Sequence, residues 1–277
     1  MTRNELGKAT VRAVRLAEPL TVDGRLDERV YQTTPAISDF IQQVPAEGAP
    51  ASENTEAWVF FDGTNIYVSA RCWDSAPPGK WTANEYRRDT NGLRQNDTFG
   101  VSFDTFFDRQ NGFVLYTNPL GARADYDVNA ETANFDWNPV WESRTARFEG
   151  GWTVEIQVPF KSLRYRSGDG QVWGMQLRRV VRRKNEYAYL NPVPPSSAGP
   201  YGLTRVSYAA SLVGLELPPA GRNVELKPYG ISRLTTDRTK TPALSNDLAS
   251  DVGIDAKYSV TSNLTADFTY NTDFAQV

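Results

Sequence analysis

Histidine is absent from the 277 residues of this chain. Its absence excludes a histidine-based catalytic triad, a histidine general base, and zinc or haem held by imidazole. The single cysteine, Cys72, excludes an intrachain disulfide. In "IYVSARC" it shares one strand face with Ile66, Val68 and Ala70, so we expect a small buried side chain.

Strong net charge and long apolar runs are also lacking. The formal net charge of -3 gives no general attraction to nucleic acid or to anionic membranes. No apolar run approaches the length of a transmembrane helix. The basic run "RRVVRRK" (Arg178–Lys184) is a local exception, but its charges would divide between the two faces of a strand. We predict that these charges pair with acidic residues or contact a neighbouring barrel rim, and we predict no nucleic-acid partner.

The chain does contain many short runs with a period of two, separated by turn residues. An apolar fraction of 40%, with 7 Trp, 13 Tyr and 13 Phe, predicts a substantial core. Alternation without convincing amphipathic helices predicts an all-β fold, an antiparallel β-sandwich. We expect its main strands at Thr55–Phe61, Ile66–Cys72, Asp97–Phe107, Phe113–Asn118, Gly151–Phe160 and Gln171–Lys184.

The sequence divides into three parts. Residues 1–19 are interpreted as an N-terminal lead, residues 20–217 as the sandwich, and residues 218–277 as a separate β region of lower complexity. In that last region "NVELKPYGISRL" and "SNLTADFTYNTDF" alternate strictly. One face of the second run would carry Leu264, Ala266, Phe268 and Tyr270. This pattern suits a strand of an outer-membrane barrel and an ordinary amphipathic strand equally well.

Several motifs occur in the order found in a known family. "VDGRLDERVY" resembles the opening of family 9 carbohydrate-binding modules, although that motif often has Trp where this chain has Tyr31. "YVSARCWDS", "NDTFGVSFDTFFDRQNGFVLYTNPLGARAD" and "GWTVEIQVPFKSLRY" are similar to the strands that follow. The similarity is closest to the subgroup that precedes an outer-membrane β-barrel region, where "LRRVVRRKNE", "RNVELKPY" and "TSNLTADFTYNTDFAQV" have counterparts.

This resemblance implies a fold, a ligand and a location. The fold would be the β-sandwich of these modules, followed by the first strands of a truncated barrel-like region. The ligand would be an oligo- or polysaccharide held between two tryptophans, with calcium nearby. The location would be outside the cytoplasm of a bacterium, in the periplasm, the outer membrane or at the cell surface. The protein's own C-terminal barrel region would be its partner.

Flat aromatic faces suit the apolar C–H face of a sugar ring. Four tryptophans lie in predicted loops: Trp73, Trp81, Trp137 and Trp141. Three others, Trp58, Trp152 and Trp173, lie within predicted strands and are assigned to the core. Trp81 and Trp137 are the preferred stacking pair because polar residues surround them, and Asn84 and Arg87 are predicted to bond the sugar hydroxyls. The alternative is that these loop tryptophans pack the loops onto the sandwich.

Four aspartates are candidate calcium ligands, because calcium prefers several carboxylate and carbonyl oxygens. They are Asp97, Asp104, Asp125 and Asp127. An extended "ADYD" segment would place the last two on the same side. No calcium-loop consensus is present, so carboxylates that are solvated or paired with arginine are the alternative.

Three functions therefore follow from the sequence. The leading hypothesis is a non-catalytic carbohydrate-binding module of an exported protein. The second is a structural domain that docks on an outer-membrane barrel through its aromatic residues and Arg178–Lys184. The third is a glycan-active enzyme that uses carboxylates only, since hydrolysis needs two suitably spaced carboxyl groups. With 33 acidic residues, spacing in the sequence selects no particular pair.

Overall fold

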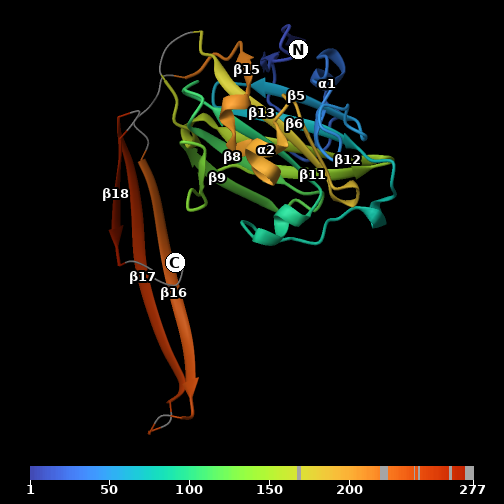
Figure 1. Ribbon diagram of the computed structural model, residues 1–277. Helices are drawn as coiled ribbons and strands as arrows, with labels where there is room; N and C mark the ends of the chain where they lie inside the picture. The colour runs from blue at the N-terminus through green and yellow to red at the C-terminus, as the bar shows by residue number, and fades with distance from the viewer. Residues whose placement is uncertain (167–169, 219–223, 240, 243, 262–263, 272–277) are drawn as a thin grey trace. The chain divides into compact units, whose positions relative to one another are not determined.

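The structure is a computed structural model, and it describes residues 1–166, 170–218, 224–239, 241–242, 244–261 and 264–271. The chain divides into two compact units, Met1–Pro219 and Ala220–Val277 (Figure 1). No helix among the described residues is long and apolar enough to cross a membrane. Each unit is described by itself below.

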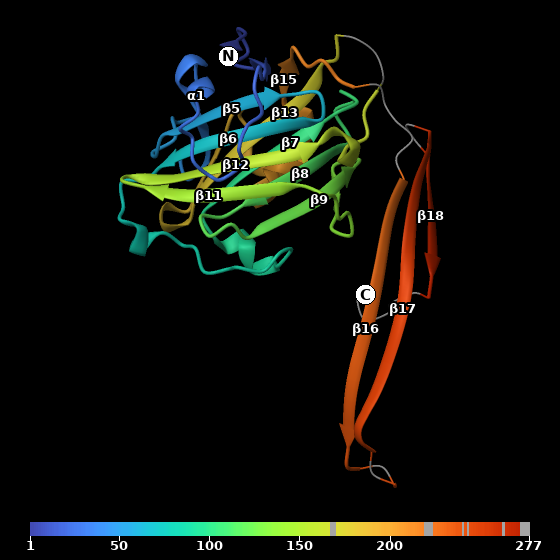
Figure 2. The ribbon, with the colours of Figure 1, turned by 180° about the vertical axis from the view of Figure 1, so that it is seen from behind.

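The first unit is a sandwich of two sheets, which confirms the predicted fold class (Figures 1 and 2). Within the described residues, the larger sheet has ten strands: β1 (Thr2–Arg3), β2 (Ala9–Arg12), β15 (Ala210–Val213), β13 (Trp173–Val181), β7 (Thr98–Asp104), β8 (Gly112–Thr117), β9 (Arg123–Asn129) and β10 (Thr132–Asn134) in spatial order, with β14 (Glu186–Tyr189) beside β13 and β4 (Ile41–Val44) beside β14. The smaller sheet has five: β11 (Glu142–Phe148), β12 (Gly151–Pro159), β6 (Asn65–Trp73), β5 (Thr55–Phe61) and β3 (Val14–Arg15). Neighbouring strands are antiparallel except β2 with β15 and β3 with β5.

The helices are short. Two are α-helices, α1 (Arg29–Thr33) and α2 (Pro195–Ala198). The 3-10 turns described are η1 (Pro78–Lys80), η2 (Asn91–Gln95), η3 (Phe160–Ser162), η4 (Arg182–Lys184), η5 (Gly199–Thr204) and η6 (Val206–Tyr208). Because η4 follows β13 directly, the strand ends at Val181 and not at Lys184 as predicted. Asn185 then takes a left-handed conformation (φ 50°), which turns the chain back into β14.

Apolar side chains cover both faces of both sheets. The main core lies between the sheets and contains the inward residues of β7, β12 and β13, including Trp152 and Trp173, together with Cys72. A second cluster lies on the outer face of the larger sheet, where α2, η5 and η6 cover it (Figure 1). A third, with Trp58 and Tyr31, lies on the outer face of the smaller sheet. The tryptophans assigned to the core and the buried cysteine are therefore confirmed.

The N-terminal lead belongs to the sandwich. β2 joins the larger sheet, and β3 joins the smaller one. The chain changes sheets at Ala13, whose N–H donates to the carbonyl of Val213 at 2.9 Å. Residues 1–19 thus contribute to both layers. β2 pairs with β15, which lies at the other end of the unit's sequence. Such a long-range pairing gives no local sequence pattern, so the sequence alone placed the start of the sandwich at residue 20.

The opening motif and the "GWTVE" motif meet at one carboxylate. Oε2 of Glu155 accepts hydrogen bonds from the backbone N–H groups of Asp23 (2.9 Å) and Gly24 (2.8 Å), and its Oε1 accepts from the hydroxyl of Tyr31 (2.7 Å). Gly24 has φ 89°, and a Cβ there would lie 2.7 Å from the carbonyl carbon of Thr145. The opening segment is therefore structural: its hydrogen bonds to Glu155 attach it to the smaller sheet.

The short helix α1 lies at the end of this opening segment. Glu28 occupies the position before α1, and no side chain caps the helix.

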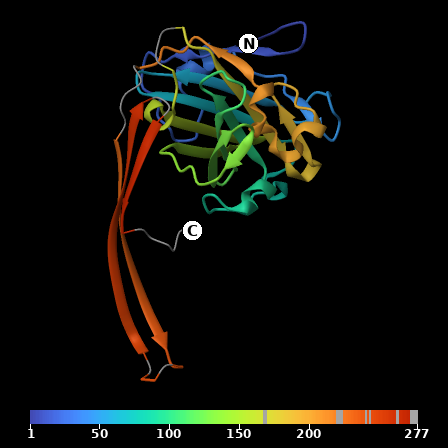
Figure 3. The ribbon, with the colours of Figure 1, turned by 60° about the vertical axis from the view of Figure 1, so that its left-hand side comes forward.

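The second unit is a three-stranded antiparallel sheet of β16 (Val224–Asp237), β17 (Leu244–Thr261) and β18 (Leu264–Tyr270), a curved ribbon in Figure 3. The register places apolar residues of all three strands on one face, because Ile254 pairs with Tyr270 and Val252 with Gly230. Exposed apolar side chains on that face are Val224, Leu226, Leu234, Leu248, Val252, Ile254, Phe268 and Tyr270. The opposite face carries polar residues such as Asp255, Thr269 and Asn271.

Glu155 predicts a pH dependence of stability. Burial raises its pKa to about 7, although the bonds from Tyr31, Gly24 and Asp23 oppose this. A carboxyl group whose pKa is raised on folding stabilises the fold fully below its unfolded pKa, and that contribution is lost as the pH rises through about 7. The variant Glu155→Gln has no titrating carboxyl group at this position and therefore lacks this pH-dependent contribution. The free energy of unfolding of the wild type relative to the variant should therefore fall by about 2–3 kcal/mol between pH 5 and pH 8.

Urea unfolding followed by tryptophan fluorescence at each pH unit measures this difference. The other titrating groups are common to both proteins and cancel. A difference that stays constant with pH, or grows as the pH rises, would contradict the assignment.

Candidate functional site

A pocket opens on the outer face of the larger sheet. Its lining residues are Arg94, Gln95, Tyr116, Tyr126, Arg178, Val180, Tyr187 and Tyr201, and it holds about 100 Å³ of free space. Strands β8, β9, β13 and β14 form the floor, and η2 and η5 supply the walls. Four aromatic rings and two guanidinium groups thus line one concavity.

The floor depends on a glycine between two large side chains. In the sheet register Arg178 pairs with Gly100, and Gly100 pairs with Tyr116 on the next strand. A Cβ at Gly100 would lie 2.8 Å from Cβ of Tyr116 and 3.0 Å from Cδ1 of Leu203. Because Gly100 has no Cβ, the side chains on either side can approach each other, and the guanidinium carbon of Arg178 lies 5.6 Å from the centroid of the Tyr116 ring. The cation and the aromatic face therefore meet across β7.

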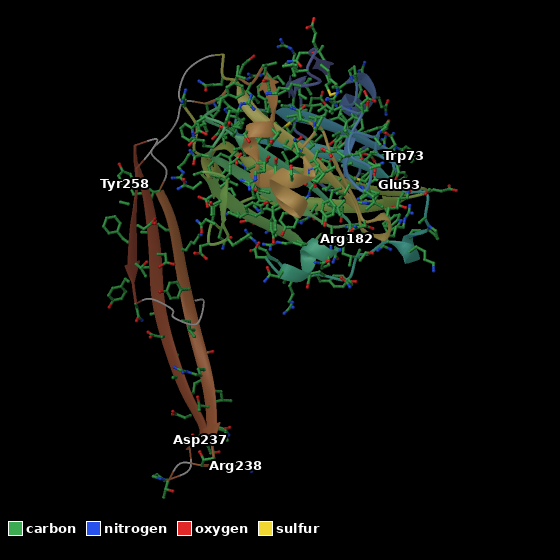
Figure 4. The ribbon with its side chains drawn as sticks, viewed as in Figure 1. Glu53, Trp73, Arg182, Asp237, Arg238 and Tyr258 are labelled. Carbon is green, nitrogen blue, oxygen red and sulfur yellow. The ribbon has the colours of Figure 1, made fainter. Side chains whose placement is uncertain are left out.

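The walls are held by arginine contacts. The guanidinium carbon of Arg94 lies 4.6 Å from the ring centroid of Phe135 and 5.3 Å from that of Tyr201. One of its nitrogens, Nη1, is 3.3 Å from the Tyr201 hydroxyl, to which it donates. On the other side Arg182, labelled in Figure 4, donates to the hydroxyl of Tyr187 (2.7 Å) and to Oε1 of Gln95 (2.6 Å). These bonds fix the rim before any ligand arrives.

The phenols of the floor remain protonated. Burial raises the pKa of Tyr116, Tyr126 and Tyr189, and the positive charge of Arg178 opposes that rise at all three. Each hydroxyl is therefore a neutral hydrogen-bonding group at physiological pH. The charge of Arg178 thus acts on two lining phenols and on the neighbouring Tyr189, and the charge of Arg94 acts on Tyr116 and Tyr126 as well.

A second arginine, Arg179, points the other way, into the core. It is 1% exposed, and its guanidinium carbon lies 4.9 Å from the Trp152 ring centroid. Its Nη2 is 3.8 Å from Oδ2 of Asp74. Burial raises the pKa of Asp97, and the charge of Arg179 opposes this rise. A cation and two carboxylates thus share the interior at this end of the sandwich.

Two further residues of the basic run, Arg183 and Lys184, pair with acidic residues as predicted, whereas Arg182 bonds Tyr187 and Gln95. Arg183 forms ion pairs with Oδ1 of Asp74 (2.7 Å) and with Glu53, and Nζ of Lys184 is 2.6 Å from Oε1 of Glu53. Glu53 is labelled in Figure 4. Although burial raises the pKa of Glu53, bonds from Lys184 and Ser75 hold it at about 2.

Two of the predicted sugar-binding tryptophans are buried. Trp81 is 8% exposed, and its Nε1–H donates to the carbonyl of Ala76 at 2.9 Å. Trp141 is 4% exposed, and its Nε1–H donates to Oδ2 of Asp125 at 2.8 Å. Trp81 therefore offers no open face for the stacking pair predicted with Trp137. Both side chains pack loops onto the sandwich, which is the alternative that the sequence left open.

The other predicted ligand-binding residues lie outside the pocket lining. Trp137 is half-buried, with its ring centroid 4.8 Å from that of Phe113. Trp73, labelled in Figure 4, is exposed and meets Phe148 edge-on at 4.9 Å. The remaining two are exposed: Asn84 accepts a bond from Nδ2 of Asn96, and Arg87 is 3.6 Å from Glu85.

The four predicted calcium ligands have separate partners. Asp97 accepts from the backbone N–H groups of Thr82 and Arg182, and Asp104 accepts from those of Asp108 and Arg109.

Asp125 and Asp127 share a face of β9, as the "ADYD" pattern predicted, but they do not share partners. Asp125 pairs with Arg88 at 2.7 Å, and Asp127 lies 3.7 Å from Arg164. Across the described ranges no group of three or more acidic or cysteine side chains could hold a metal ion. Within those ranges, the arrangement matches the arginine-paired alternative for these two residues.

The tyrosines of the pocket are not among the ligand-binding residues predicted from the sequence, because that prediction rested on tryptophans in loops. A signal was present in "FVLYTN", where Phe113 and Leu115 belong to the core. Val114 and Tyr116 must then point to the opposite face. The same reasoning applied to β9 would have placed Tyr126 beside Tyr116.

Comparison with known proteins identifies the family. The family model described as "Carbohydrate family 9 binding domain-like" matches residues 22–186, so the chain belongs to this family. A search of curated proteins gave no match.

Solved structures show the same fold. A family 9 carbohydrate-binding module from Caldicellulosiruptor kristjanssonii in complex with cellotriose is 14% identical, with a TM-score of 0.54, over 77% of this chain and 95% of that one. Its complex with glucose has the same identity and TM-score, over 78% and 98%. A putative carbohydrate-binding protein from Bacteroides uniformis is 8% identical, with a TM-score of 0.59, over 74% and 99%.

Arg179 generates a prediction about the interior. Arg179→Met removes the buried cation and leaves Asp97 and Asp74 in place. The variant should lose about 3 kcal/mol or more of unfolding free energy at pH 7. The loss should be smaller at pH 5, because the pKa of Asp97 rises further in the variant and its protonation then favours the folded state.

Urea unfolding at both pH values measures these losses. Arg25→Met, at an exposed position, is the matched control and should change stability by less than about 0.5 kcal/mol. Equal losses of unfolding free energy for Arg179→Met at pH 5 and pH 7 would show that the charge of Arg179 does not stabilise the buried carboxylates.

Proposed function

We propose that the sandwich is a non-catalytic carbohydrate-binding module and that the sugar binds at the pocket of Tyr116, Tyr126, Tyr187 and Tyr201, against the exposed ring of Tyr201 (43%). The observation that carries this proposal is the set of aromatic rings and fixed polar groups in that concavity. Rings cover the C–H face of a sugar, while hydroxyl, amide and guanidinium groups bond its hydroxyls. The family and the two sugar complexes of one structural relative support the same ligand class.

The pocket suits binding better than hydrolysis. No carboxylate is among the described residues that line it, whereas glycosidic hydrolysis needs two carboxyl groups across the bond. Its free space of about 100 Å³ is below the roughly 300 Å³ of ordinary small-molecule sites. The floor would therefore receive part of one sugar residue, with the remaining chain on the rim.

Tyr201 offers a direct test of this site. It is 43% exposed, so its removal should leave the fold intact. Tyr201→Ala removes an aromatic wall of the pocket and a hydrogen-bond partner of Arg94, and it should weaken binding of the best oligosaccharide about tenfold or more. Tyr86→Ala, at a 73% exposed tyrosine outside the pocket lining, is the control and should bind normally.

A glycan array on the full chain selects the ligand, and isothermal titration measures both variants. The proposal would be wrong if no glycan on the array binds, or if the Tyr201 variant and the wild type bind with equal affinity. Calcium remains a proposal for the same module, and repeating the titration in a calcium chelator tests it: unchanged affinity would remove calcium from the site.

A second proposal concerns location and the C-terminal unit. We infer that the protein is exported to the bacterial outer membrane and that the apolar face of β16–β18 contacts lipid or the protein's own continuing barrel. The observation that favours this is the row of exposed apolar side chains along one face, among them Leu226 (60%) and Tyr270 (74%). Alternating apolar and polar faces on long strands are typical of outer-membrane strands.

Adjacent residues of β18 test this second proposal. Phe268→Asp places a charge on the apolar face, and Thr269→Asp places it on the polar face. Membrane fractionation should recover the wild type and the Thr269 variant with the outer membrane, and severalfold less of the Phe268 variant, since a lipid-facing charge costs a few kcal/mol. Cytoplasmic recovery of the wild type, or equal recovery of both variants, would contradict it.

A further inference from the structure

The pocket of the proposed sugar site carries positive charge. Its described lining contains two arginines, Arg94 and Arg178, and no aspartate or glutamate. Arg182 adds a third guanidinium at the rim through its bond to Tyr187. The whole chain, in contrast, has 33 acidic and 30 basic residues. The pocket is therefore a local cationic site on an acidic protein.

Two described carboxylates near the pocket, Asp89 and Asp97, have partners elsewhere. The charge of Asp89 acts on the Tyr116 phenol, but Oδ2 of Asp89 lies 3.0 Å from Nε of Arg88. Asp97 accepts the backbone N–H of Arg182 and lies on the core side, where the charge of Arg179 acts on it. Each of these carboxylates thus has a partner away from the pocket.

Arg94 is oriented for a ligand. Its guanidinium lies near the rings of both Phe135 and Tyr201, and its bond to the Tyr201 hydroxyl helps to fix its position. A guanidinium has five N–H donors, more than this bond requires. A planar, pre-positioned guanidinium is the group that binds a carboxylate with two parallel hydrogen bonds.

We propose that the pocket recognises an acidic oligosaccharide and that the recognised anion is the carboxylate of a uronic acid residue. This inference rests on the proposed sugar site and specifies its ligand class. The carboxylate binds Arg94 with help from the charge of Arg178, while the sugar ring lies against the exposed Tyr201. A ring-borne carboxylate is small and planar enough for about 100 Å³ of free space.

Matched ligands test the anion directly. Isothermal titration of the full chain compares an oligogalacturonide with the same oligosaccharide after its carboxyl groups are reduced to alcohols. The acid should bind about tenfold or more tightly, because a hydrogen bond to a charged group is worth that factor. Raising sodium chloride from 50 to 300 mM (roughly a twofold shorter screening length) should weaken the acid and leave the reduced ligand unchanged. Arg94→Gln should remove most of the acid's advantage, and the exposed Arg25→Gln should keep it.

The outcomes separate this inference from the proposed function. Equal affinity for the acid and the reduced ligand, with both lost in Tyr201→Ala, would overturn the acidic preference and leave the sugar site in place. Absence of binding by any glycan would overturn both. A sulfated galactan oligosaccharide that binds more tightly than the uronide would overturn the choice of a carboxylate. Retention of the acid's advantage in Arg94→Gln would also overturn it.

Discussion

A guanidinium buried between two sheets is the constraint on which much of the first unit depends. Arg179 lies in the core, where its guanidinium contacts the ring of Trp152 and forms an ion pair with Asp74. A buried charge is tolerated only when opposite charges accompany it. The requirement therefore places Asp74 at the end of β6 and Asp97 at the start of β7, both almost inaccessible to solvent. Two sheets are fixed against each other by charge as well as by apolar packing.

The same carboxylates carry this constraint outward to the pocket. Asp97 accepts the backbone N–H of Thr82, at the start of the segment that leads to Arg94. It also accepts the backbone N–H of Arg182, whose side chain bonds Tyr187 and Gln95. The buried carboxylate of Asp97 thus bonds directly to the backbone of one rim arginine, Arg182. The pocket's shape follows from the interior, which explains why its residues come from distant parts of the sequence.

Much of the fold could be predicted because strand alternation and turn residues are local. The hairpin of β5 and β6 and the core face of β12 follow from period two alone. The parallel pairing of β2 with β15 could not, since it joins the two ends of the unit. The candidate site was harder still. Its floor lies on the outer face of strands that are buried on both sides, where alternation no longer separates a core face from a solvent face.

The division of labour between aromatic residues explains why the site lies where it does. An indole has one N–H donor and a large apolar surface, so it is satisfied by one carbonyl or carboxylate and then packs. Trp58, Trp81 and Trp141 each do this, with Thr34, Ala76 and Asp125 as acceptors. A phenol can donate and accept at its tip, so a half-enclosed ring still serves a polar ligand. In this chain Trp81 and Trp141 pack loops onto the sandwich, whereas around the pocket Tyr116, Tyr126 and Tyr187 are buried and the ring of Tyr201 remains exposed. Arginine beside those rings then supplies the charge that a purely aromatic surface lacks.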